Sequence, residues 1–502
     1  MKSKRLTQLM LIMLGCSMVT TAVDAEAVPV SMAHASPANG GVFEGWGTSL
    51  CWWANRLGYS DALAQQAADL FFGEDGLRLN IMRYNIGGGD DPAHHHITRT
   101  DSAVPGWMVW DESQQRFVYD YTADHNQLNV LLRAVRAAGE DALVEVFSNS
   151  PPYFMTVSGC SSGGADPGKN NLREDCCDDF AEYLVHVTDY IQRQLGVTVT
   201  SISPMNEPNT DYWRCLSDKQ EGCHVDAGEA QSRIIEEVAD ALGRRGIGNV
   251  IIAASDETSP DKQLEEWYAY SDRARAAIGR VNTHSYSENG IAELGRLARE
   301  QNLHLWMSEV DGDGTAGENA GEMGAALWLG RKIISDMNAL TPSAWVMWQV
   351  IDNHISAGGY NGNRDSGMVD VNRGYWGLAV ADHDRETIVL TQKYYGLGQF
   401  TRYIRPGSTL IACGDDALAA YDPAAKELVI VAVNASARER EVTFDLSGFD
   451  AVGSSARVIR TSGGMADGEH WAALPDLPLS GKALTAALRG NAITTFVIGG
   501  VE

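Results

Sequence analysis

The chain has 502 residues, of which 44% are hydrophobic and 21% are charged. Such a composition is typical of a globular protein with a large core, and it excludes a fibrous or largely disordered chain. The formal net charge of -27 argues against nucleic acid or an anionic membrane surface as a partner, because like charges repel.

Residues 1–27 are predicted to form an export signal. Three basic residues precede the apolar run 9–14, and small residues that suit a signal peptidase follow it. The run is too short to remain as a membrane-spanning helix, and no later segment is long and apolar enough to be one. Leu14-Gly15-Cys16 loosely resembles a bacterial lipoprotein box, which makes a lipid anchor at Cys16 the alternative to simple cleavage. We therefore expect an exported protein, periplasmic or extracellular.

Between residues 44 and 385, eight short apolar runs alternate with helical patterns or polar loops. This rhythm of repeated βα units predicts an α/β fold, a (β/α)8 TIM barrel. The predicted barrel strands are 45–50, 77–85, 142–148, 200–204, 249–254, 281–285, 303–308 and 344–350.

From residue 386 to residue 502 the pattern changes to short alternating segments, such as 427–433 and 494–498, that are separated by turn residues. We expect this part to be an antiparallel β-sandwich attached to the barrel. Residues 28–43 are strand-like as well and are expected to join the sandwich. No low-complexity linker separates the two parts, so we expect them to be docked rigidly.

The chain has eight cysteines, and seven remain if the predicted signal is removed. At least one of the seven is then unpaired or intermolecular. No cysteine or histidine spacing matches a zinc site, and neither a metal nor another cofactor is predicted. Export makes disulfides reasonable in two places, namely across the loop between Cys215 and Cys223 and around Cys160, Cys176 and Cys177.

Two glutamates follow or end predicted barrel strands. Glu207, in Asn206-Glu207-Pro208, follows the fourth strand, and Glu309 follows the seventh. The C-terminal ends of all strands of a barrel meet at one face, so the two carboxylates should lie together. Cleavage of a glycosidic bond with retention needs a carboxylic acid and a carboxylate about 5 Å apart. We therefore predict Glu207 and Glu309 as the catalytic pair of a glycoside hydrolase.

Several polar residues near these glutamates are predicted to bind the substrate or to hold the pair. Asn206 can donate a hydrogen bond to a sugar hydroxyl. Arg83 lies inside an apolar strand, so we expect it to pair with a catalytic carboxylate or to form a structural ion pair at the barrel rim. His284 and Tyr286 end the sixth strand and can hold the nucleophile, although a histidine bonded to the backbone is the alternative.

Three tryptophans near strand ends, Trp52, Trp53 and Trp348, are further candidates for substrate binding. Indole rings stack on the apolar face of pyranose sugars, and sugar clefts are often lined with them. The alternative is that some of these indoles fill the core of the barrel.

Ordered motifs run along the chain after the predicted signal. They are Gly45-Trp46-Gly47-Thr48-Ser49-Leu50-Cys51-Trp52-Trp53-Ala54, Arg83-Tyr84-Asn85-Ile86-Gly87-Gly88, Ser148-Asn149-Ser150-Pro151-Pro152-Tyr153-Phe154-Met155, Asn206-Glu207-Pro208 and Tyr394-Tyr395-Gly396-Leu397-Gly398-Gln399-Phe400. This set of motifs resembles glycoside hydrolase family 30, and its β-1,6-galactanase subfamily most closely. The paired tryptophans at 52 and 53 are the reason for preferring that subfamily.

The resemblance implies a retaining mechanism with Glu207 as acid/base and Glu309 as nucleophile. It also implies a poly- or oligosaccharide substrate, β-1,6-linked galactan such as the side chains of arabinogalactan, and we expect a monomer without other partners. A β-1,6-glucanase, or another branch of the family acting on xylan or glucosylceramide, is the first alternative. A non-catalytic carbohydrate-binding protein and an inverting hydrolase, with carboxylates about 6.5 to 9.5 Å apart, are the others.

Overall fold

The computed structural model describes residues 27–311, 322–365 and 377–502. Residues 1–26 of the predicted export signal, which include Cys16, lie outside the described residues. None of the described helices has both the length and the hydropathy needed to cross a bilayer.

Eight parallel strands close into a barrel, in the order β10-β11-β2-β3-β6-β7-β8-β9. Each one overlaps a predicted strand, so the (β/α)8 prediction is confirmed. The strands are almost entirely buried, because helices cover the outside of the barrel and side chains fill its interior. They are β2 (Gly45–Ser49), β3 (Ile81–Asn85), β6 (Leu143–Phe147), β7 (Val199–Ser203), β8 (Ile251–Glu257), β9 (Ile278–His284), β10 (His304–Glu309) and β11 (Ala344–Gln349).

Helices follow most of the barrel strands, and their ends carry the expected signals. The longest, α4, has Asp178 and Asp179 in its first turn, where the helix dipole favours carboxylates, and ends at Gly196 in the left-handed region (φ 71°). The described α-helices are α1 (Trp53–Leu57), α2 (Asp61–Ala67), α3 (His125–Ala138), α4 (Cys177–Leu195), α5 (Glu229–Arg245), α6 (Pro260–Ala269), α7 (Asp272–Ala277), α8 (Ile291–Glu300), α9 (Met323–Ala339) and α10 (Gln392–Thr401).

The C-terminal part is a β-sandwich, as predicted. A six-stranded sheet in the order β15-β16-β17-β22-β19-β20 faces a three-stranded sheet, β1-β18-β21. β1 pairs in parallel with β18, next to the start of the described chain. The strands are β1 (Ala27–Pro29), β15 (Thr409–Ala412), β16 (Ala417–Asp422), β17 (Glu427–Asn434), β18 (Arg440–Asp445), β19 (Ser455–Ser462), β20 (Glu469–Pro478), β21 (Ala483–Leu488) and β22 (Ala492–Gly499).

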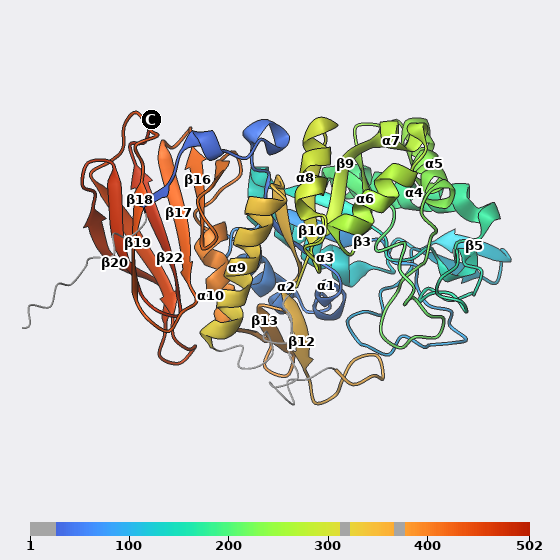
Figure 1. Ribbon diagram of the computed structural model, residues 1–502. Helices are drawn as coiled ribbons and strands as arrows, with labels where there is room; N and C mark the ends of the chain where they lie inside the picture. Colours follow the sequence, from blue (N-terminus) through green and yellow to red (C-terminus); the bar gives the residue numbers. More distant parts are fainter. Residues whose placement is uncertain (1–26, 312–321, 366–376) are drawn as a thin grey trace, which may run out of the picture.

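The six-stranded sheet is the middle of three layers. On one face, Leu428 and Phe496 pack in the sandwich core with Phe444 of β18. On the other face, Val433 and Ile493 belong to the same apolar cluster as the barrel. This double burial explains why β17 is one continuous apolar run, since a strand covered on both faces has no polar side to alternate. Figure 1 shows α9 and α10 between this sheet and the barrel.

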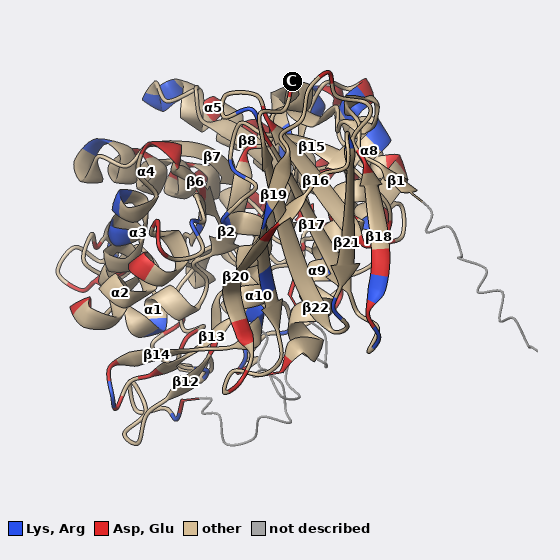
Figure 2. Ribbon diagram, turned by 90° about the vertical axis from the view of Figure 1, so that its left-hand side faces the viewer, with Lys and Arg blue, Asp and Glu red and all other residues tan. Residues whose placement is uncertain are grey.

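Two smaller sheets lie outside the barrel and the sandwich. β12 (Ile351–Ile355), β13 (Ala379–Asp382) and β14 (Thr387–Leu390) form a sheet directly after the last barrel strand. β4 (Met108–Asp111) and β5 (Arg116–Tyr119) form a hairpin between β3 and α3. Figure 2 shows acidic and basic residues interspersed over both parts of the molecule, so the charge of -27 is spread rather than gathered on one element.

Candidate active site

The structure brings the two predicted carboxylates together at the C-terminal face of the barrel. Glu309 is the last residue of β10, and Glu207 lies four residues beyond the end of β7. One carboxylate oxygen from each lies within 4.8 Å of the other, and His284 at the end of β9 lies between them. Its Nδ1 atom is 3.2 Å from Glu207 Oε1 and 3.5 Å from Glu309 Oε1. The ends of three barrel strands, β7, β9 and β10, therefore converge on one small polar site.

Glu309 is held from two further sides. The Tyr286 hydroxyl donates a hydrogen bond of 3.1 Å to Glu309 Oε1, and Arg83 Nη1 lies 3.5 Å from Oε2. Burial raises the pKa of Glu309 to about 7, a rise that the positive charges of His284 and Arg83 oppose and the negative charge of Glu207 increases.

Arg83 fulfils both of the roles considered for it. It contacts Glu309 and also forms structural ion pairs, with Glu145 at 2.8 Å and with Asp256. The guanidinium is fully buried, so it touches the carboxylates and not a bound sugar. The prediction that Arg83 binds substrate directly is therefore corrected to a role beneath the carboxylates.

His284 is fully buried as well, and its ring nitrogens face carboxylates rather than the backbone. Nε2 lies 3.2 Å from Asp256 Oδ1, opposite the contacts of Nδ1. Burial alone would lower the pKa of His284, but Glu309 and Asp256 outweigh it and raise the pKa well above its usual value. The imidazole thus lies between the carboxylates of Glu207, Glu309 and Asp256, an arrangement that suits proton chemistry.

Glu207 has an unusual backbone conformation, with φ of 46° in the left-handed region. Its amide donates to the carbonyl of Asp256 (2.9 Å), and its own carbonyl accepts from Trp213 Nε1 (3.1 Å) and Thr210 Oγ1 (2.9 Å). The Tyr212 hydroxyl donates to Glu207 Oε2. These contacts hold both the backbone and the carboxylate of Glu207 in place.

A cleft of about 740 Å³ opens above the two glutamates, and Asn206, Tyr286, Trp52 and Trp348 line it. The two indoles meet edge to face with centroids 5.0 Å apart. Trp53 is different: it is fully buried, its Nε1 donates to the carbonyl of Ser49, and it packs in the core. The prediction that Trp53 binds substrate is wrong, because Trp53 begins α1 and that helix turns its ring inward.

Several residues that shape this site were not predicted from the sequence. Asp256, near the end of β8, could have been found by the rule that revealed the glutamates, namely a carboxylate at the end of a barrel strand. Tyr212 and Arg99 lie on loops and carry no such signal. The Arg99 guanidinium lies 4.6 Å from the centre of the Trp52 ring, and Arg99 pairs with Asp352 (2.8 Å) at the edge of the cleft.

The expected disulfides differ from the one in the structure. Cys160 pairs with Cys215, which joins the two places where separate bridges were expected. Cys176, Cys177 and Cys223 are free and buried, because they face the barrel core. The disulfide therefore ties the loop after β6 to the loop that follows Glu207.

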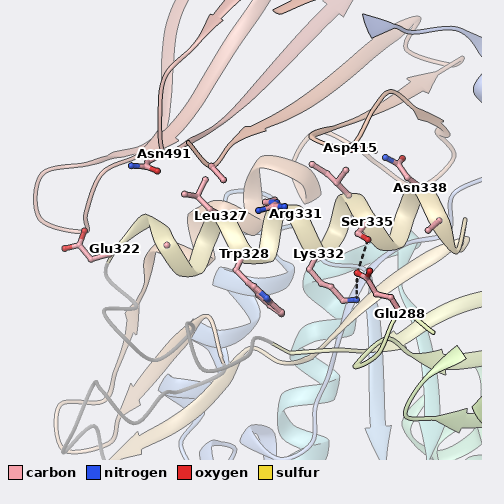
Figure 3. Close-up of a pocket in the computed structure, with 14 residues that line it drawn as sticks. Glu288, Glu322, Leu327, Trp328, Arg331, Lys332, Ser335, Asn338, Asp415 and Asn491 are labelled. Atoms are coloured by element: carbon pink, nitrogen blue, oxygen red, sulfur yellow. Dashed lines mark hydrogen bonds and ion pairs between the residues drawn. The ribbon is translucent and has the colours of Figure 1, made fainter. Parts of the chain in front are cut away.

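A larger cavity, of about 1070 Å³, lies along α9 between the barrel and the sandwich. Figure 3 shows Trp328 and Lys332 on one side of this helix and Leu327 on the other. Glu288 accepts a hydrogen bond from Ser335 (3.0 Å) and lies 3.7 Å from Lys332. The carboxylates that line this cavity among the described residues, those of Glu288, Glu322 and Asp415, are all exposed, so we place the chemistry in the smaller cleft.

Glu221, on the loop after β7, is a buried acid that supports the cleft without lining it. Its Oε1 accepts from the amides of Gly88 (2.7 Å) and Gly89 (3.1 Å), and its Oε2 from Asn85 Nδ2 (3.3 Å). Burial raises the pKa of Glu221 to about 8, although these hydrogen bonds oppose the rise. The folded protein thus binds this proton more tightly than the unfolded chain.

We expect this acid to make stability fall as the pH rises. The contribution of Glu221 is fully present below its unfolded pKa near 4.5 and is lost as the pH rises through about 8. Urea unfolding at several pH values should show a loss of at least about 1 kcal/mol between pH 5 and 8.5 that Glu221→Gln reduces. Glu439→Gln, at an exposed position, is the control. An unchanged slope in Glu221→Gln would contradict the assignment.

The sequence profile of O-glycosyl hydrolase family 30 matches residues 40–299, more than half of the chain. The chain belongs to glycoside hydrolase family 30. It is therefore a glycoside hydrolase, and the resemblance noted in its motifs is confirmed.

Two relatives of this family 30 hydrolase are an endo-β-1,6-galactanase and an exo-β-1,6-galactobiohydrolase. The chain is 29% identical to an endo-β-1,6-galactanase of Hypocrea rufa over 488 residues, which cover 92% of this chain and 93% of that protein. It is 26% identical to an exo-β-1,6-galactobiohydrolase of Bifidobacterium longum, covering 87% of this chain and 36% of that protein. The alignment thus covers nearly the whole of one relative and about a third of the other.

Solved structures share the fold of this family 30 hydrolase. A conserved exported protein from Bacteroides fragilis aligns with a TM-score of 0.72 at 19% identity, covering 94% of this chain and 100% of that one. The catalytic domain of xylanase C of family 30 from Talaromyces cellulolyticus aligns with a TM-score of 0.68 at 17% identity, with the same coverage. At these identities the likeness concerns the architecture alone.

Proposed function

We propose that this family 30 hydrolase is exported and cleaves β-1,6-galactosidic linkages, as in the side chains of arabinogalactan, with retention of configuration. The similarity to the Hypocrea rufa endo-β-1,6-galactanase along nearly the whole of both chains supports the substrate. The carboxylate oxygens within 4.8 Å of each other carry the mechanism, because an inverting enzyme needs room for a water between the two groups.

In this mechanism Glu309 attacks the anomeric carbon while Glu207 protonates the glycosidic oxygen, and the leaving sugar departs. The product is an α-linked galactosyl ester of Glu309. Glu207, now ionised, takes a proton from water, which displaces Glu309 and releases a β-configured sugar. Tyr286 and Arg83 hold the attacking carboxylate, and the charge of Arg83 stabilises its anionic form against the rise in pKa that burial causes.

Two buried polar atoms of the cleft residues support the binding of a sugar. Asn206 Oδ1 and Trp52 Nε1 are buried and have no hydrogen-bond partner among the described residues. One is an acceptor and the other a donor, and buried groups of this kind are normally paired. Sugar hydroxyls both donate and accept, so a bound galactosyl unit would satisfy both, with the Asn206 amide next to the 2-hydroxyl.

The test is product release from de-arabinosylated arabinogalactan by the chain without residues 1–27, with β-1,6-glucan and xylan as controls. We expect galactose or short β-1,6-galacto-oligosaccharides, and proton NMR during the first minutes should show the β-anomer before mutarotation. Product length distinguishes cleavage within chains from release at an end. Activity on a control polysaccharide alone would change the substrate that we assign. An initial α-anomer would exclude retention.

A further inference from the structure

The loop after β7 carries Glu207 at its start and is tied to the loop after β6. The Cys160–Cys215 disulfide joins the two loops across a sequence separation of 55 residues. Cys215 lies eight residues after Glu207 and three after Tyr212. The covalent link therefore lies next to the residues that contact the proposed acid/base.

Main-chain hydrogen bonds continue this link. The amide of Gly164 donates to the carbonyl of Trp213 (3.2 Å), and the amide of Cys215 donates to the carbonyl of Gly164 (3.0 Å). The Ser162 hydroxyl donates to the carbonyl of Arg214 (2.9 Å). The two loops thus form a short parallel bridge at Gly164 and Arg214. The bridge thus fixes the carbonyls of Trp213 and Arg214 and the amide of Cys215.

Two glycines allow the close packing of this bridge. Gly163 has φ of 136°, and a Cβ atom there would lie 2.2 Å from the carbonyl carbon of Trp213. A Cβ atom on Gly222 would lie 2.1 Å from the indole ring of Trp213. Any side chain at either position would push Trp213 away. The indole is therefore held in one place, and it is 6% exposed.

Tyr212 and Trp213, at the start of the fixed segment, hold Glu207 at two atoms, and His284 of β9 faces a third. Trp213 Nε1 donates to the Glu207 carbonyl (3.1 Å), which supports the left-handed backbone. The Tyr212 hydroxyl donates to Oε2 of the carboxylate, while His284 faces Oε1 at 3.2 Å. Contacts at both oxygens stop the carboxylate from rotating about its last side-chain bond. The direction in which Glu207 can deliver a proton is thereby set.

We propose that Tyr212 is a positioning residue for the acid/base Glu207, held in place by the Cys160–Cys215 clamp. Tyr212 is 46% exposed and lines the cleft, so it also forms the wall beside the sugar that leaves. This inference rests on the proposed function of Glu207. The role of Tyr212 is additional to that proposed function, because the disulfide-linked loop is assigned to the protonation step and not to binding or folding in general.

The first test compares two leaving groups in Tyr212→Phe. Cleavage of galactan expels a sugar alkoxide and needs the acid, whereas the 4-nitrophenyl glycoside of β-1,6-galactobiose expels a stable phenolate and does not. We expect kcat/KM on galactan to fall about 10- to 100-fold and that on the nitrophenyl glycoside to change less than about threefold. Tyr268→Phe, at a site 68% exposed and outside the cleft lining, is the control.

Equal losses on the two substrates, or no loss on either, would overturn the proposal. The activity of the wild-type protein on polysaccharides distinguishes this outcome from a failure of the proposed function. If it cleaves another polysaccharide instead of galactan, the same comparison is made with that polysaccharide and its nitrophenyl glycoside. If it cleaves no glycoside at all, the proposed function fails first.

The second test addresses the clamp. The double variant Cys160→Ser/Cys215→Ser should show the same loss confined to galactan, and adding Tyr212→Phe should produce little further loss, because both changes free the same carboxylate. Circular dichroism and a thermal midpoint show whether the variant is folded. Trp213→Phe removes the indole N–H while keeping an aromatic ring, and it is the substitute if the cysteine variant does not fold. Independent, multiplicative losses would contradict the clamp.

Discussion

Glutamine at position 309 is expected to lower kcat on β-1,6-galactan by about 10⁴-fold or more, since loss of a nucleophile removes most of the catalysis that depends on it. An amide cannot form the galactosyl ester. Its oxygen can still accept the hydrogen bond from Tyr286, and its volume is nearly that of glutamate, so we expect the variant to fold. Initial rates and circular dichroism of Glu309→Gln check both statements.

Rescue of activity by azide shows which of the two catalytic roles Glu309 has. In Glu309→Gly an azide ion can occupy the vacated space and attack the nitrophenyl galactoside from the same face, which should give the α-galactosyl azide. A β-galactosyl azide would make Glu309 the acid/base and reverse the proposed roles. Glu288→Gln, an exposed acid beside the larger cavity along α9, is the matched control and should keep wild-type activity.

Much of this site could be predicted because it follows the regular part of the fold. Parallel strands end at one face, so a carboxylate after the fourth strand and one at the seventh had to meet there. The pairing of Arg83 could be predicted as well, because an unpaired charge inside a buried strand is costly. Arg83 pairs with Glu145, Asp256 and Glu309.

The irregular parts could not be predicted, because local pattern does not determine which loops touch. Trp52 and Trp53 are adjacent and chemically identical, yet their side chains lie in different places. Trp52 lines the cleft, whereas Trp53 begins a helix and its ring packs in the core. The pairing of the disulfide could not be predicted for the same reason. Cys160 and Cys215 meet only because two loops on neighbouring strands lie side by side above the barrel.

Changing Glu207, the proposed acid/base, should affect activity differently from changing Glu309, the proposed nucleophile. In Glu207→Ala we expect kcat/KM on galactan to fall about 10³- to 10⁴-fold, within the range that general acid catalysis supplies. The loss on the nitrophenyl glycoside should be much smaller, because its leaving group needs no proton. The glycosyl-enzyme still forms, so azide should attack it from the opposite face and give the β-galactosyl azide. An α-product would contradict this role.

The pH dependence supplies an independent check on the same residue. The pKa of Glu309 is raised to about 7, so the pair of carboxyls holds one proton below about pH 7 and loses it above. Wild-type kcat/KM on galactan should therefore fall as the pH rises through about 7, since no acid remains to protonate the leaving oxygen. In Glu207→Ala that alkaline limb should disappear, because the acid is already absent. If the limb persists in this variant at its original position, the proton belongs to another group, and the carboxyl pair does not govern the reaction.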